Sequence, residues 1–467
     1  MSQSTERTGG VNPSTAPAMI SGNAVIEPAK ELVVYDEADV IVVGGGPGGM
    51  AAAVAAGRSG AKTILIERYG CLGGMATGGL VTIFPNMSDD EGNVLIKGLN
   101  EEMMERLRAR NACDHPPKEK WGSKDPKEVD YYRKTSIFYT MRGFVNYAVH
   151  VDAEELKCVY DDMVEEAGVK TYLHAWGTSA IVDASGKVCG VVFESKSGRQ
   201  AILGKVVIDS TGDGDLLPSA GASFESDIPK GMRISAASHC YWIANVDKEK
   251  LNAWRSTDEG AKQFEEQANE LMSIGAHPRW INSLLPDQES LIWFHPRYEC
   301  LDQCDVASLT GVEFAGRKSM RKTFDYRKAN TPGFEKSYMV LSSPQLGTRC
   351  SRRVVGEYML NKEDAAAART FDDTIALFPC GGLGGPTLHV PYRSLVPRGV
   401  DGMLVACRAT SMDLTISEYL NLIPHCVAFG QAAGIAAAQA VSAGVGVRDI
   451  DIKALQADLK KQDVPLP

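Results

Sequence analysis

The pattern of hydrophobic and polar positions predicts a strand, a turn, a helix and a second strand near the start of the chain. An apolar run at residues 40–43 ends in glycines, and an alanine-rich stretch at residues 50–56 leads to a second apolar run at residues 63–66. Short apolar runs are typical of buried strands, and runs of small helix-forming residues are typical of helices. We therefore expect a strand–turn–helix–strand unit here.

The same periodicity predicts further elements along the chain. Residues 99–110 and 152–167 have the spacing of helices, and two alternating apolar runs flank Ser185 and Gly186 as in a β-hairpin. A third apolar run ends at residue 209 in glycines and aspartates, and a long helix is expected at residues 424–443.

Residues 226–380 lose this alternation of strands and helices. They carry most of the tryptophans, and the α/β pattern returns only at about residue 386. The sequence therefore predicts an α/β fold in which a Rossmann-like domain contains an inserted α+β domain that covers the ligand with aromatic residues and sets specificity. The expected division is a flexible tail at 1–37, a discontinuous nucleotide-binding domain at 38–225 and 386–446, the inserted substrate domain at 226–385, and a C-terminal helix and tail at 447–467.

The glycines of the first turn have the spacing of a dinucleotide-binding fingerprint. Gly44 would allow the tight turn, Gly46 would let the backbone approach a pyrophosphate, and Gly49 would let the helix pack closely on the strand. The helix N-terminus offers free N–H groups to the phosphates, and Glu67, at the end of the second strand, would accept hydrogen bonds from a ribose. The alternative is a glycine-rich turn without a ligand, but the strand, helix and Glu67 together favour dinucleotide binding.

Composition narrows the class of protein. The chain has 467 residues, of which 44% are hydrophobic, and a formal net charge of -10, so we expect a large core and no nucleic-acid partner. The glutamines at positions 431 and 439 interrupt the most apolar late stretch, so no membrane span is expected. The N-terminal 37 residues lack the pattern of a secretory signal, and the 11 scattered cysteines are typical of free thiols in a reducing compartment. The expected location is cytoplasmic.

Five motifs in order make the chain resemble a known family. They are "VVGGGPGG", "ERYGCLGGMATGG", "VVIDSTGDGD", "PQLGTRCSRRVVGEYML", and "PYRSLVPRGVDGMLVACRATSMD" followed by "AFGQAAGIAAA". Together they resemble the FAD-dependent oxidoreductases of the glutathione-reductase-like fold. The resemblance covers residues 38–445 and implies FAD as the cofactor, whereas the substrate varies within such a family.

The resemblance also implies roles for individual residues. Glu67 would bind the adenosine ribose with Arg68 near the adenine, and the Gly212–Asp213 turn would close the far side of the cofactor. Asp413 would reach the ribityl chain or the pyrophosphate. A further group would lie along the pyrophosphate and flavin, namely Gly74, Met75, Ala76 and Thr77. Arg408 would also bind the cofactor, and the chain departs from the pattern where Cys407 precedes it, because a glycine is usual before that arginine.

Candidate catalytic residues cluster in the segment that leads back into the nucleotide-binding domain. In the resembling fold this segment leads to the flavin, so His389 would take a proton as hydride leaves the substrate, and Arg393 would bind a substrate carboxylate. Tyr392 lies between them. A structural histidine at position 389 and a structural ion pair at Arg393 are the alternatives, and His239 is a second candidate for the substrate cavity. No metal site is expected.

These observations predict an FAD-dependent dehydrogenase or oxidase that transfers a hydride between a small organic substrate and the flavin. The substrate would be an alcohol, an amine or an activated C–C bond. Two alternatives stay open, a flavoprotein electron-transfer subunit acting with a partner protein and an NAD-binding dehydrogenase without flavin. The oligomeric state is also open, a homo-oligomer included.

Overall fold

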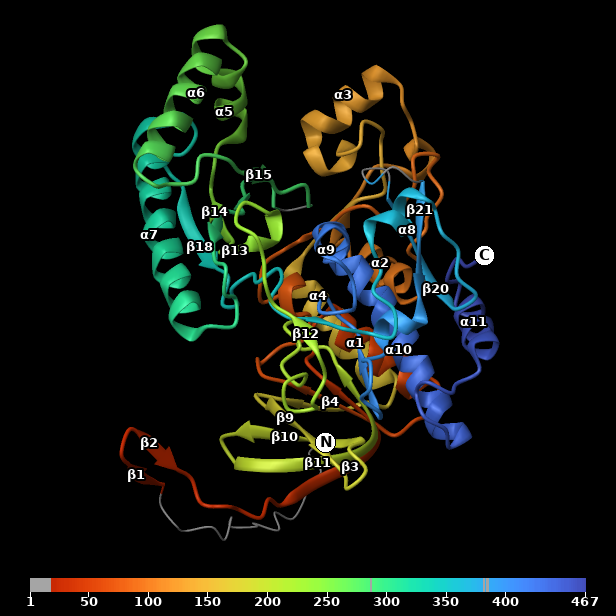
Figure 1. Ribbon diagram of the computed structural model, residues 1–467. Coiled ribbons are helices and arrows are strands. Elements are labelled where there is room, and N and C mark those ends of the chain that lie inside the picture. The colour runs from red at the N-terminus through yellow and green to blue at the C-terminus, as the bar shows by residue number, and fades with distance from the viewer. Residues whose placement is uncertain (1–17, 286–287, 381–382, 384–385) are drawn as a thin grey trace, which may run out of the picture.

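A seven-stranded sheet forms the base of the protein (Figure 1). The computed structural model describes residues 18–467, except 286–287, 381–382 and 384–385. The strand order is β8-β4-β3-β11-β10-β9, and β22 pairs with β11 beyond this path. These strands are β3 (Val34–Val43), β4 (Thr63–Glu67), β8 (Lys170–Leu173), β9 (Trp176–Val182), β10 (Val188–Ser195), β11 (Gly198–Asp209) and β22 (Met403–Val405).

Four parallel strands of this sheet end side by side. The register places Val43 of β3 beside Ile66 of β4 and beside Asp209 of β11, and Asp209 lies opposite Val405 of β22. Glycine-rich segments follow β3, β4 and β11, so the backbone turns away from the sheet at the same edge. Ligands of open α/β sheets bind at the carboxyl edge of such strands, which makes this edge the place to look for a site.

Helix α1 (Pro47–Arg58) packs on α10 (Ile423–Ala443) through small residues, and both lie above the sheet with α4 (Ala153–Glu166) in Figure 1. A Cβ atom on Gly430 would lie 2.0 Å from the carbonyl oxygen of Gly48, and one on Gly434 would lie 2.2 Å from that of Ala52. The small residues of the late helix therefore set how closely the two helices approach. Among the described residues, α10 alone is long and apolar enough to cross a membrane, and 67% of its most apolar window is buried inside the protein.

The segment rich in aromatic residues forms a smaller sheet with three helices, drawn in green and teal in Figure 1. The sheet order is β15-β16-β14-β18, built from Ile281–Asn282, Ile292–Phe294, Tyr241–Ala244 and Tyr338–Ser342. Helices α5 (Lys248–Arg255), α6 (Asp258–Ser273) and α7 (Val306–Asn330) complete it. Its aromatic side chains pack mainly within this part of the chain; the rings of Tyr241 and Phe294, for example, stack at 4.7 Å.

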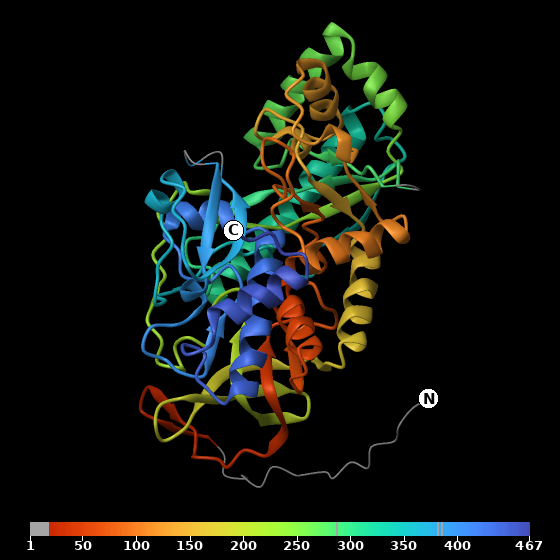
Figure 2. The same ribbon diagram turned by 90° about the vertical axis from the view of Figure 1, so that its right-hand side faces the viewer.

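Several local predictions agree with the structure, and others do not. Helix α2 (Leu99–Ala109), helix α4 and the β9–β10 hairpin lie where the periodicity predicts them. The 25-residue α7 was not expected. Part of the expected flexible tail is a hairpin of β1 (Met19–Ser21) and β2 (Ala24–Ile26), and residues 1–17 lie outside the described residues. This hairpin lies at the end of the molecule opposite α5 and α6 in both views (Figures 1 and 2).

The remaining elements lie outside the seven-stranded sheet and the smaller sheet. The hairpin of β20 (Thr374–Pro379) and β21 (Thr387–Pro391) contacts α10 through β20, although its residues fall largely in the range expected for the inserted domain. The sequence-based domain boundaries stay a prediction. The other elements are β5 (Ile83–Phe84), β6 (Cys113–Asp114), α3 (Pro126–Thr135), β7 (Val149–Val151), β12 (Phe224–Glu225), β13 (Ala236–Ser238), β17 (Arg297–Glu299), β19 (Arg353–Val354), α8 (Lys362–Ala366), α9 (Leu414–Leu420) and α11 (Ile452–Lys461).

Candidate functional site: a cofactor cleft and a second cleft beside it

The three fingerprint glycines have three different surroundings. Gly44 has a φ of +96°, and a Cβ atom on it would lie 2.5 Å from the Ser210 carbonyl oxygen. A Cβ atom on Gly49 would lie 1.7 Å from the carbonyl oxygen of Gly44, so the helix packs directly on the turn. A Cβ atom on Gly46 would meet no protein atom within 4 Å. Two of the glycines are thus required by the protein itself, and the third leaves a space open at the helix N-terminus.

That open space belongs to a cleft at the carboxyl edge of the parallel strands, which we call the cofactor cleft. It encloses about 640 Å³ of space, its open mouth included. Eight of the thirteen residues predicted to bind a cofactor line it: Gly44, Gly46, Glu67, Arg68, Gly74, Met75, Gly212 and Arg408. The structure therefore brings together residues from four segments that are far apart in the sequence.

Glu67 is held in place by the backbone around the turn. One carboxylate oxygen accepts a hydrogen bond from the Gly45 N–H at 2.6 Å, and the other accepts one from the Tyr69 N–H at 2.8 Å. Burial raises the pKa of this carboxyl group, and the two backbone donors oppose that rise. A carboxylate has about four acceptor positions, so Glu67 can still accept hydrogen bonds from ribose hydroxyls.

Arg68 and Trp176 form the end of the cleft next to Glu67. The guanidinium carbon of Arg68 lies 5.0 Å from the ring centre of Tyr69 and 5.9 Å from that of Trp176. Trp176, the first residue of β9, lines the cleft with 53% of its surface exposed. An exposed indole and a guanidinium are suited to stack on a planar base. The sequence reasoning missed Trp176, because only the strand order brings β9 next to β4.

The second glycine-rich segment covers the first turn. Gly74 begins the short 3-10 helix Gly74–Ala76, and a Cβ atom on it would lie 3.0 Å from the Gly46 Cα atom. Met75 lines the cleft, whereas Ala76 is buried behind it and the Thr77 hydroxyl donates to the Leu72 carbonyl at 2.6 Å. Ala76 and Thr77 therefore support the loop from behind in this structure.

Arg408 lies against the Gly212 backbone and is neutralised by Asp213. Its terminal nitrogen donates to an Asp213 carboxylate oxygen at 2.7 Å, and the Ser351 hydroxyl donates to the same oxygen at 2.6 Å. Burial alone would raise the pKa of Asp213, but the Arg408 charge and these hydrogen bonds hold it below its usual range. Asp213 is not itself at the cleft surface; Asp215 is. Burial, followed by the charges of Asp213 and Asp209, raises the pKa of Asp215 to about 6.

Two cysteines line the cofactor cleft, and Asp413 does not. Cys407 occupies the position where a glycine is usual, and Cys426 approaches from α10. Burial raises the pKa of both thiols, that of Cys426 to about 12, so both are neutral and poor nucleophiles. Asp413 is the N-cap of α9, where it accepts the Ile416 N–H at 2.7 Å and the Lys362 N–H at 3.0 Å. In this structure Asp413 stabilises a helix end and a loop.

A second cleft adjoins the cofactor cleft and shares four residues with it, namely Pro47, Met75, Arg408 and Cys426. Its remaining lining is largely apolar and also includes Ser238, Thr348, Arg349 and Asn421. The N-terminus of α10 also opens here, at Leu422 and Ile423. Among the described residues, none of the aromatic side chains expected to cover the ligand lines either cleft; they form the core of the smaller sheet instead.

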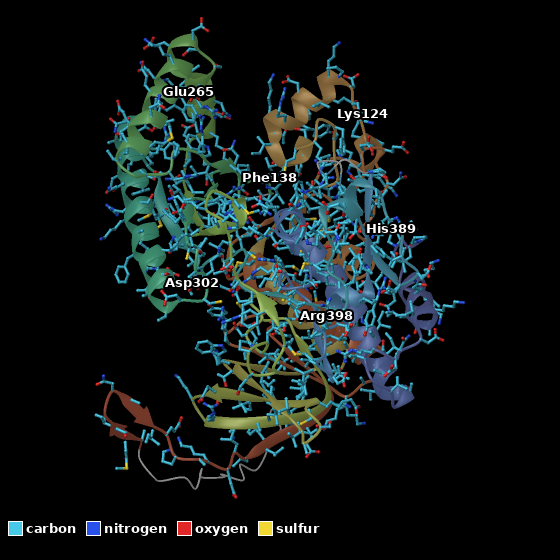
Figure 3. All side chains as sticks on the ribbon, in the orientation of Figure 1. Lys124, Phe138, Glu265, Asp302, His389 and Arg398 are labelled. Atoms are coloured by element: carbon cyan, nitrogen blue, oxygen red, sulfur yellow. The ribbon has the colours of Figure 1, made fainter. Side chains whose placement is uncertain are left out.

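The three predicted catalytic residues line neither cleft. His389 is a residue of β21 and is labelled in Figure 3. Tyr392 is buried and donates to the Val447 carbonyl at 2.8 Å, and Arg393 pairs with Asp373 at 3.0 Å. The ion pair agrees with the structural alternative for Arg393, and Tyr392 is bound to the backbone. The loop before His389 includes positions outside the described residues, and the catalytic assignment of His389 stays a prediction.

The fold and the cofactor cleft define a mixed α/β protein of the Rossmann type that holds a dinucleotide cofactor at the carboxyl edge of its sheet. The sequence profile described as "FAD dependent oxidoreductase" matches residues 39–381 and 382–459. The chain therefore belongs to the FAD-dependent oxidoreductase family, and its cofactor is FAD. The open space at Gly46, the acceptor Glu67 and the two glycine loops suit this cofactor.

Other comparisons are local or distant. A stretch of 39 residues is 56% identical to dihydrolipoyl dehydrogenase 1, mitochondrial, of Arabidopsis thaliana and 59% identical to leghemoglobin reductase of Glycine max. Each match spans 8% of this chain and 8% of the relative, so the activities of those proteins are not transferred to this chain.

Two solved structures align over 91% of the chain. The p-nitrophenol 4-monooxygenase of Pseudomonas putida is aligned over 85% of its own length with 11% identity and a TM-score of 0.45. A geranylgeranyl bacteriochlorophyll reductase-like protein of Thermoplasma acidophilum is aligned over 83% of its length with 14% identity and a TM-score of 0.43. Likenesses at this level carry no argument about activity.

Proposed function

We propose that the chain is a dehydrogenase or oxidase that transfers a hydride between a small organic substrate and FAD. The observation that carries this proposal is the second cleft, which opens directly beside the cofactor cleft and is lined mainly by apolar side chains. A largely apolar cleft with a few polar groups is typical of a small-molecule site. When bound, FAD supplies the acceptor or donor of the hydride.

The residues of the chain would hold the cofactor and exclude water. The turn at Gly46 and the first N–H groups of α1 would receive the phosphates, and Glu67 would hold the ribose, with Arg68 and Trp176 beside the base. The N-terminus of α10, at the second cleft, would favour negative charge in its vicinity. Val81, Ile83 and Pro85 would keep water from the substrate's apolar part.

Anaerobic reduction of the flavin against a panel of alcohols, amines and saturated acids tests the proposal. We expect at least one class of compound to bleach the flavin absorbance in a single-turnover experiment, and oxygen or an added acceptor to restore it. Two other outcomes would replace the proposal. Fast reduction by NADH or NADPH with oxygenation of an added compound would make the protein a monooxygenase, and reduction only by a partner protein would make it an electron-transfer subunit.

A further inference from the structure

Arg349 is a partly buried cation that lines the second cleft. It follows Thr348 in the segment that returns from the smaller sheet, and its side chain lines the cleft. Its terminal nitrogen donates to the Ser238 hydroxyl at 3.0 Å and contacts His295 Nε2 at 2.8 Å, and its buried Nε has no hydrogen-bond partner. Among the described residues, no carboxylate forms an ion pair with Arg349, whereas Arg408, the other arginine of this cleft, is paired with Asp213.

The positively charged neighbours of Arg349 make its own charge less favourable in free energy. Burial, followed by the positive charges of Arg233 and Arg297, lowers the pKa of Arg349 to about 9, and the negative charge of Glu418 opposes this only in part. Burial and the charge of Arg349 also lower the pKa of His295, which leaves that imidazole neutral and able to accept a hydrogen bond. Arg349 therefore stays positively charged at neutral pH. Its surroundings favour the binding of an anionic ligand. A charge removed from water without an ion-pair partner costs the fold free energy. An anionic ligand would offset that cost, which is the physical reason to expect one at this cleft.

The rest of the cleft limits what that partner can be. The apolar residues of the lining include Val81, Ile83 and Pro85, together with Leu422 and Ile423 at the start of α10. The ligand must therefore present an anionic group to Arg349 and an apolar body to these side chains. Asn421 is already engaged, because its amide accepts from Arg233 at 2.7 Å and donates to the Arg349 carbonyl at 3.2 Å.

We propose that Arg349 binds the carboxylate of the substrate and that the substrate is a small organic acid with an apolar body. A guanidinium fork is suited to a carboxylate, and Ser238 and His295 contact one of its two terminal nitrogens, which leaves its other donors for a ligand. This inference rests on the proposed function, since it names the substrate class of the same cleft. It assigns to Arg349 the role that the sequence suggested for Arg393, which is instead half-exposed and paired with Asp373.

Binding of benzoate and benzamide to the FAD-loaded protein tests this proposal without turnover. The two probes have nearly the same shape and differ in charge. We expect calorimetry and the flavin spectrum to show benzoate bound at least about 30-fold more tightly than benzamide, because one buried charge pair accounts for the difference. Arg349→Met should abolish this preference and keep FAD. Arg297→Met removes the same charge from the same cluster outside the cleft lining and should change the preference by no more than about threefold.

Three results would overturn the proposal. They are equal binding of the two probes to the parent, an unchanged preference in Arg349→Met, and loss of FAD from Arg349→Met, which would make Arg349 part of the cofactor site. Should Arg349→Met not fold, Arg349→Lys decides through the same ratio of affinities, which should fall at least about threefold because the fork is lost. Failure of the proposed function would appear differently, as a flavin that no small compound reduces although benzoate binds.

Discussion

Gly46→Ala should separate cofactor binding from folding. Gly46 has a φ of -67° and a ψ of -175°, an extended conformation that alanine adopts freely, and the added Cβ atom would meet no protein atom within 4 Å. The methyl group would lie in the space that the turn leaves open for a phosphate. The apoprotein should therefore tolerate the change, and the cofactor should not.

The structure sets the size of both effects. Alanine is a poorer N-cap than glycine by a few tenths of a kcal/mol or more, but it restricts the unfolded chain by about 0.4–1 kcal/mol, so the free energy of unfolding should change by less than about 1 kcal/mol. A phosphate kept away from the helix N-terminus loses one or two charge-assisted hydrogen bonds, each of about 1.5–3 kcal/mol. The affinity for FAD should then fall by about 10-fold to 10,000-fold.

Thermal unfolding of the apoprotein and titration with FAD measure the two effects. Gly49→Ala is the matched control, because its Cβ atom would lie 1.7 Å from the Gly44 carbonyl oxygen. This control should lower the melting temperature of the apoprotein strongly. An unchanged FAD affinity in Gly46→Ala would refute the placement of the phosphates at this turn. A melting temperature as low as that of Gly49→Ala would show that the space beside Gly46 cannot take a methyl group.

Three further predictions concern charged and titratable groups. The raised pKa of Asp215, about 6 in the folded state, means that ionisation opposes folding as the pH rises from about 4 through 6. After allowance for the partial exposure of Asp215, Asp215→Asn should therefore stabilise the apoprotein by about 1–2 kcal/mol at pH 8 and by almost nothing at pH 4. A difference in melting temperature that does not vary with pH would contradict this. Asp213→Asn leaves Arg408 without its carboxylate and should lower the free energy of unfolding by about 3–5 kcal/mol in denaturant titrations; a loss below about 1 kcal/mol would mean that solvent reaches Arg408. His389→Ala tests the catalytic assignment that stays open: a loss of about 100-fold or more in the rate of flavin reduction is expected if His389 takes the proton, and a rate within about threefold of the parent would contradict that role, in line with its position outside both clefts.

The sequence predicted the cofactor cleft well because its chemistry is local. The turn glycines, the helix that follows and Glu67 lie within one strand–turn–helix–strand unit. Gly44 and Gly49 are constrained by atoms of that unit or of the segment after the neighbouring strand β11, whereas Gly46 leaves the turn open. Gly74 and Met75 follow directly on the second strand. Such positions can be identified from spacing, because the backbone between them has few conformations open to it.

The second cleft could not be predicted in the same way, because it is assembled from segments that only the folded chain brings together. Ser238 comes from β13, Arg349 from the loop after β18, Asn421 from the end of α9, and Val81 from the loop after the second glycine segment. None of these positions has a spacing signal. Trp176 was missed for the same reason, since nothing in its neighbourhood in the sequence indicates that β9 begins at the cleft.

Arg349 and Arg393 show why a charged residue cannot be assigned from the sequence alone. Both are arginines in segments with aromatic or polar neighbours, and a substrate carboxylate is a reasonable partner for either. The structure distinguishes them by the partner that the protein already supplies: Asp373 lies 3.0 Å from Arg393, whereas Arg349 has only neutral acceptors. A cation whose charge is compensated within the fold stabilises the fold, and a buried cation without a carboxylate is stable only at a cost that a ligand can offset. A cation at the second cleft that no carboxylate pairs with is therefore the observation from which we infer the substrate's chemistry.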